Sequence, residues 1–107
     1  MAAPEHYERV QTLLRKVYQD TMFRSDPALD HPLYAELIDM GPEIVPALLR
    51  QLEEFQDPDD LSIWHAISAL YALTEVDPIP QEHAGRLREI IGDWLEWGRK
   101  EGIKWDV

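Results

Sequence analysis

Residues 61–74, with the sequence LSIWHAISALYALT, decide the fold. Ten of these fourteen residues are apolar, and only Ser62, His65, Ser68 and Thr74 are polar. Wound into a helix, this stretch has no side suited to water, and such a helix is normally covered by neighbours on several sides. We therefore expect residues 61–74 to form the central helix of an all-α protein.

The segment before this helix supplies a partner helix and a sharp turn. From residues 41–42 (GP) onward, apolar residues recur at spacings of three and four as far as Phe55, which predicts an amphipathic helix. Pro46 lies near its start, where it costs one backbone hydrogen bond without ending the helix. Residues 57–60 (DPDD) then open the central helix, because aspartate caps a helix, proline fits its first position and further acids meet its positive end.

Further helices are expected on both sides of this pair. Amphipathic spacing predicts helices at residues 5–20, 32–40 and 81–99, a loop at 21–31 and a stiff proline-rich connection at 77–80. The last helix is expected to fray at Gly98 and Gly102, which leaves the tail, residues 100–107, free to be flexible or to fold back. A chain of 107 residues has room for one core. The sequence thus predicts a single all-α domain, residues 1–107, folded as a compact bundle of four to five helices.

Two of the expected helices resemble one HEAT-repeat unit. Residues 41–52 (GPEIVPALLRQL) carry an early proline and leucines at three and four spacing, an acidic turn follows, and residues 61–73 form an alanine-rich inner helix. HEAT arrays bury their faces by stacking several units, so this resemblance implies a HEAT-like hairpin closed into a bundle by the outer helices. A wider pattern, from residues 31–34 (HPLY) to residues 94–98 (WLEWG), is similar to an uncharacterised family of short bacterial proteins. That resemblance implies a bacterial cytoplasmic origin, but it does not indicate any particular activity.

Acidic residues are concentrated in the middle of the chain. Between Ser25 and Gly85 there are thirteen acidic residues and a single basic one, Arg50, whereas the two ends are nearly balanced, so the middle carries the whole net charge of −11. Such a surface repels a nucleic-acid backbone, and it attracts and steers a basic partner. The charge also fits a plain role in solubility.

Several protein classes are excluded by what the sequence lacks. The chain has no cysteine, which removes disulfides, thiolate metal sites and thiol nucleophiles. The first residues lack the basic and apolar regions of a secretory signal, and no apolar run approaches the ~20 residues that span a bilayer. We expect a soluble cytoplasmic protein.

One group of candidate binding residues crowds the turn before the central helix: Glu53, Glu54, Asp57, Asp59 and Asp60. Helix capping accounts for the three aspartates, and a docking edge for a basic protein accounts for the whole cluster. A calcium loop does not fit, because the glycine of the sharp bend is missing and Ser68 stands where a closing glutamate is required.

Tryptophans form the second group. Trp64 and Trp94 lie on the expected inner faces of their helices and are expected in the core. Trp97 lies at the margin of the last helix, and Trp105 follows the tail glycines. Exposed tryptophans are frequent binding anchors, whereas a tail that folds back would bury them. The sequence leaves both alternatives open, and Trp97 and Trp105 join the candidate partner-binding residues.

No catalytic, cofactor-binding or metal-binding constellation emerges. The four histidines, His6, His31, His65 and His83, lack the spacing that places two metal ligands on one helical face, and there is no glycine-rich phosphate loop. We therefore expect no enzyme but a protein-interaction module, an inhibitory, antitoxin-like, immunity-like or scaffolding partner of a basic protein, without direct binding to nucleic acid or membranes. Two alternatives stay open: a nucleic-acid mimic that blocks a DNA-binding enzyme, and a small enzyme that uses His31 or His65 with nearby carboxylates.

Overall fold

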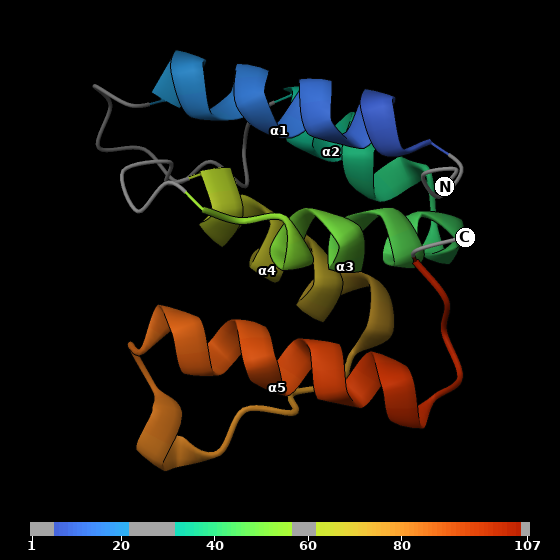
Figure 1. Ribbon diagram of the computed structural model, residues 1–107. Coiled ribbons are helices and arrows are strands. Elements are labelled where there is room, and N and C mark those ends of the chain that lie inside the picture. Colours follow the sequence, from blue (N-terminus) through green and yellow to red (C-terminus); the bar gives the residue numbers. More distant parts are fainter. Residues whose placement is uncertain (1–5, 22–31, 57–61, 106–107) are drawn as a thin grey trace.

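A computed structural model describes residues 6–21, 32–56 and 62–105 (Figure 1). Within these ranges the chain forms helices and no strand, which confirms the all-α prediction. The elements in chain order are α1 (Tyr7–Thr21), α2 (Pro32–Asp39), the 3-10 helix η2 (Pro42–Ile44), α3 (Val45–Glu53), α4 (Ser62–Thr74), the 3-10 helix η3 (Gln81–His83) and α5 (Leu87–Lys100). All five α-helices contribute to one hydrophobic core, and the Cα radius of gyration of 13.1 Å matches the value of about 13 Å expected for a compact chain of this size.

The centre of the bundle is α3. This helix packs against α1, α4 and α5, and in Figure 1 it lies between α1 above it and α5 below it. Its buried side chains are those of Val45, Ala47, Leu48, Leu49 and Leu52. The predicted central helix, α4, likewise packs against three helices, α1, α2 and α3.

The helix α4 is covered on one side and open on the other. Ile63, Ala66, Ala69 and Leu70 are buried against the core, as expected. Trp64, however, is 37% exposed and Tyr71 is 56% exposed, so the expectation that Trp64 lies in the core is wrong. The neighbouring helix α2 has eight residues against the thirteen of α4.

Two helix boundaries differ from the prediction because of glycine and proline. The expected helix at residues 81–99 is broken between η3 and α5, where Gly85 has a φ of +79°, in the left-handed region that glycine adopts most readily. The start of α3 is displaced by η2, and Pro46 falls in the first turn of α3, where its missing N–H removes no intrahelical bond. No described helix is long and apolar enough to cross a membrane.

The tail after α5 folds back onto the bundle. Gly98 lies inside α5 and is buried, so the expectation that the helix frays there is wrong. A Cβ atom on Gly98 would lie 2.8 Å from Cδ1 of Leu49 and 2.8 Å from Cζ3 of Trp105, which shows how closely α3, α5 and the tail approach one another. Trp105 is only 5% exposed and belongs to the core. Of the two alternatives for the tail, the structure shows the folded-back one.

Candidate functional site

The acidic cluster before α4 is only partly within the described residues. Asp57, Asp59 and Asp60 lie outside them, whereas Glu53 and Glu54 are exposed at the end of α3. The carboxylate of Glu53 accepts a hydrogen bond from the indole N–H of Trp105. Glu53 therefore holds the tail of the chain against α3. The role of Glu53 and Glu54 in docking a partner stays a prediction.

Glu54 fastens α1 in the same way. Its carboxylate accepts a hydrogen bond from the Tyr7 hydroxyl, which lies in α1, and another from Arg50 Nε at 2.7 Å. Burial of the Tyr7 ring, together with the bond to Glu54, raises the pKa of Tyr7 to about 12. The phenol therefore stays protonated at neutral pH and remains a donor to Glu54.

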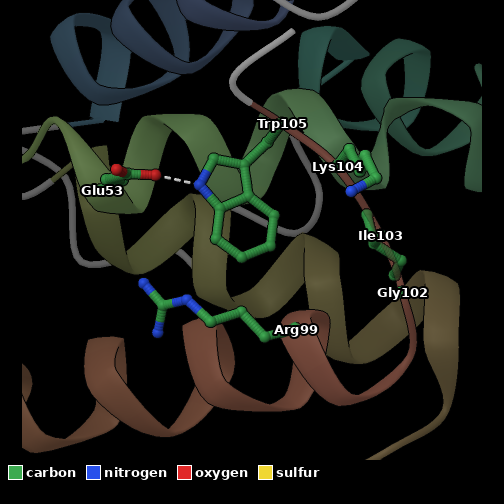
Figure 2. Close-up of a pocket in the computed structure, with 6 residues that line it drawn as sticks. All are labelled: Glu53, Arg99, Gly102, Ile103, Lys104 and Trp105. Atoms are coloured by element: carbon green, nitrogen blue, oxygen red, sulfur yellow. Dashed lines mark hydrogen bonds between the residues drawn. The ribbon is translucent and has the colours of Figure 1, made fainter.

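Trp105 closes a small polar pocket beneath the tail. Figure 2 shows its indole between the Glu53 carboxylate and the side chain of Arg99, whose Cζ lies 5.6 Å from the ring centroid. The pocket has a volume of about 240 Å³ and is lined by Glu53, Arg99, Gly102, Ile103, Lys104 and Trp105. Drug-sized ligands usually occupy pockets of about 300–1,000 Å³. Trp105 is buried and packs the tail against the bundle. The expectation that it is an exposed binding anchor is therefore corrected.

Trp97 is half-buried and keeps part of its ring at the surface. Its ring packs edge-to-face against the buried ring of Trp94, with centroids 5.4 Å apart and an interplanar angle of 84°. Trp97 also lines a shallow cleft of about 160 Å³ together with Pro78, Asp93, Glu96 and Lys100. The structure separates Trp97 and Trp105, because the first faces this cleft and the second faces α3.

Beside this cleft, His83 is joined to α5. Its Nδ1 lies 2.8 Å from Oδ2 of Asp93, and this hydrogen bond raises the pKa of His83 above its usual value of 6.5. Protonated His83 is therefore favoured in the folded state. Its contribution to stability is complete below about pH 6.5 and is lost as the pH rises through the folded-state pKa.

We expect Asp93→Asn to lower the pKa of His83, measured by NMR titration of the imidazole Hε1 resonance. The stability lost in this variant, measured by urea unfolding, should be larger at about pH 5.5 than at about pH 8.5. Glu96→Gln, one turn away and bonded to Lys100, is the control and should leave the His83 titration unchanged. An unshifted titration in Asp93→Asn would show that the pair does not form in solution.

The largest recess described here is an apolar groove of about 620 Å³ between α2, α4 and the segment that follows α4. We call it the α2–α4 groove. It is lined by Tyr34 and Ile38 of α2, by Ile67, Ser68, Tyr71 and Ala72 of α4, and by Asp77 and Ile79. In Figure 1 α2 lies behind α1, and α4 lies behind α3. The exposed ring of Tyr71 is part of the wall of the groove.

The electrostatics of the groove are negative. Among the described residues that line it there is no lysine or arginine, and Asp77 is the one that is charged. Asp39 follows Ile38 at the end of α2, and Glu75 follows the end of α4; both are exposed, and neither forms an ion pair with another described residue. The carboxyl ends of both helices add partial negative charge through their dipoles.

The third wall of the groove is held rigidly. Thr74 Oγ1 donates to the Leu70 carbonyl at 2.7 Å and accepts from the Val76 N–H, and Asp77 Oδ1 accepts from the Ile79 N–H. Between them Glu75 has a φ of +55°, a left-handed conformation uncommon for residues other than glycine. This capped turn and its flanking prolines fix Ile79 beside α4.

The sequence prediction placed none of the partner-binding residues in this groove. A signal was present, because a helix that is apolar on every face must either be covered all round or leave an apolar face open. The face lined by Ile67 and Tyr71 is the open one. Tyr34 is a second feature that singles out this groove. Its buried hydroxyl has no hydrogen-bond partner among the described residues, and burial raises the pKa of Tyr34.

The histidines offer no comparable site. His65 is half-buried in α4 and lines neither the groove, the tail pocket nor the Trp97 cleft, and His31 lies outside the described residues. No group of three or more potential metal ligands occurs in the part of the chain that the structure describes. The α2–α4 groove is therefore the best candidate functional site.

Comparison of the chain with models of protein families, with curated proteins and with solved structures finds no match. The resemblances to a HEAT unit and to short bacterial proteins therefore stay predictions. Function must be argued from the groove, the charge and the residues themselves.

Proposed function

We propose that this chain is an acidic protein-interaction module that binds a basic protein and inhibits or scaffolds it. The observation that carries the proposal is the α2–α4 groove, which is apolar and is walled entirely by residues from the acidic middle of the chain. An apolar recess can seat an anchoring side chain, and surrounding charge of one sign steers the oppositely charged partner toward it.

The alternatives find less support in these features. A nucleic-acid mimic needs regularly spaced acids along one continuous face, and an apolar groove adds nothing to such a phosphate-like path. An enzyme needs titratable groups that converge on a substrate, whereas the described lining of the groove has one carboxylate, two tyrosines and no histidine. A docking surface requires neither arrangement.

Reversing two charges near the groove should slow association with the partner. Asp39 and Glu75 are exposed, so the double variant Asp39→Lys, Glu75→Lys should keep the fold. We expect its association rate to fall roughly three- to tenfold at low ionic strength, with the dissociation rate nearly unchanged. The difference should vanish at about 1 M salt, where the Debye length is about 3 Å.

Surface plasmon resonance measures both rates, using a partner that immobilised wild-type protein retains from a cell lysate and mass spectrometry identifies. The double variant Glu89→Lys, Glu101→Lys is the matched control, because it changes the net charge equally on exposed residues of α5 and its end. It should slow association much less. Equal rates for wild type and Asp39→Lys, Glu75→Lys at low salt, or a partner that is itself acidic, would contradict the proposal.

A further inference from the structure

Resting on the proposed function, we infer that the α2–α4 groove receives an amphipathic helix of the partner, with apolar residues on one face and lysine or arginine on the other. In helix-in-groove recognition, apolar side chains at positions i, i+3, i+4 and i+7 enter a hydrophobic groove between helices. The groove has the wall spacing and the charge for such an occupant.

The spacing of the walls matches a helix. On α2 the lining residues Tyr34 and Ile38 are one turn apart, and on α4 Ile67 and Tyr71, and likewise Ser68 and Ala72, are one turn apart. Four residues of helix advance about 6 Å, so both walls repeat at the interval at which an incoming helix repeats its own side chains. Apolar ridges of one helix can therefore enter gaps between ridges of the other.

Small side chains on α4 allow close approach. Ser68 and Ala72 form a row of small side chains beside the row of the larger Ile67 and Tyr71. A helix backbone can approach such a row more closely than it can approach leucine or phenylalanine. Ile79, whose backbone N–H donates to Asp77 Oδ1, lines the same groove from the segment after α4.

The charge distribution selects a basic occupant. Asp77 lies in the wall, Asp39 and Glu75 stand at the carboxyl ends of α2 and α4, and none of the lining residues that the structure describes is basic. An acidic helix, or a second copy of this chain with its net charge of −11, would bring like charges together. The lysines or arginines of a basic amphipathic helix would meet these acids while its apolar face enters the groove.

The probe for this inference is a synthetic peptide of about fifteen residues, the length at which an isolated helix becomes marginally stable. It carries leucines at i, i+3, i+4 and i+7 and lysines at most other positions. A second peptide has the same composition with the leucines moved off a common face, and a third has glutamate in place of lysine. Affinity is measured by isothermal titration calorimetry and location by amide shifts in ¹⁵N-labelled protein.

We expect the first peptide to bind at least about tenfold more tightly than the other two, with the largest shifts at Ile67, Ser68, Tyr71 and Ile79. Ala72→Gln adds neutral bulk to the groove and should weaken binding of the first peptide at least about tenfold. Ala35→Gln is the matched control, since Ala35 is exposed on the same helix as Tyr34 but does not line the groove, and its affinity should stay within about twofold of wild type.

The outcomes separate this inference from the function on which it rests. Equal affinity for the first two peptides, or shifts confined to residues outside the groove, would overturn the groove as a helix site while leaving electrostatic binding of a basic partner intact. Equal affinity for the lysine and glutamate peptides would overturn the requirement for a basic partner. Self-association in analytical ultracentrifugation that Ala72→Gln abolishes would replace the partner helix with a second copy of this chain.

Discussion

Leu70→Asp is expected to unfold the domain, whereas Tyr71→Asp, one residue further along α4, should leave it folded. Leu70 is fully buried and Tyr71 is 56% exposed. An aspartate at position 70 would place an unpaired carboxylate in the core, which costs about 4 kcal/mol or more. That is a large part of the 5–15 kcal/mol by which domains are usually stable.

The two positions make a matched pair because they share a helix and lie in the same last turn. The unfavourable interaction of a new carboxylate with the helix dipole is therefore common to both, and Tyr71→Asp should cost about 1 kcal/mol or less in total. Circular dichroism during urea unfolding measures both variants. Comparable destabilisation of the two would show that α4 is covered all round, as its sequence pattern suggests, and that the α2–α4 groove is filled.

Helical structure could be predicted from the sequence because it depends on local spacing. The inner face of α1 was predicted from apolar residues at three and four spacing, and Val10, Leu14 and Val17 are buried. Trp94 was expected in the core for the same reason and is fully buried. Each of these predictions needed only a window of a few helical turns.

The position of each helix in the bundle could not be predicted in this way. The residues of α4 are apolar on every face. The sequence pattern therefore does not distinguish a buried face from an exposed one, and it cannot predict which face the neighbouring helices will cover. Which face stays open depends on how the other helices pack against α4, and that is a property of other segments. The more amphipathic α3 packs against α1, α4 and α5.

The candidate site could not be predicted because it joins three segments. Tyr34, Tyr71 and Ile79 share one groove only after α2 has packed beside α4. Trp105 shows the same limit, because its hydrogen bond to Glu53 spans 52 residues of sequence. A tail interrupted by glycines is compatible with an exposed chain end and with one that packs on the bundle. What decides between the two is a surface on α3 and α5 into which the indole fits.

That surface depends on Gly98, and Gly98→Ala is expected to destabilise the protein by about 1–3 kcal/mol. The new methyl group would lie 2.8 Å from the Trp105 ring and 2.8 Å from Cδ1 of Leu49. Leu49 is fully buried and has little room to move, so the tail must shift outward and weaken the bond from Trp105 to Glu53. Urea unfolding followed by circular dichroism measures the loss.

Gly92→Ala is the control, because Gly92 lies in the same helix with nothing within 4 Å of the added Cβ. Replacing this exposed glycine by alanine should stabilise α5 by about 0.5–1 kcal/mol. Removing the indole removes one of the two 2.8 Å contacts and leaves the one with Leu49, so Gly98→Ala should cost less in a Trp105→Ala background than in wild type. If Gly98→Ala stabilised the wild-type protein as Gly92→Ala does, the tail could not be seated on α5, and Trp105 would again be available as an exposed anchor.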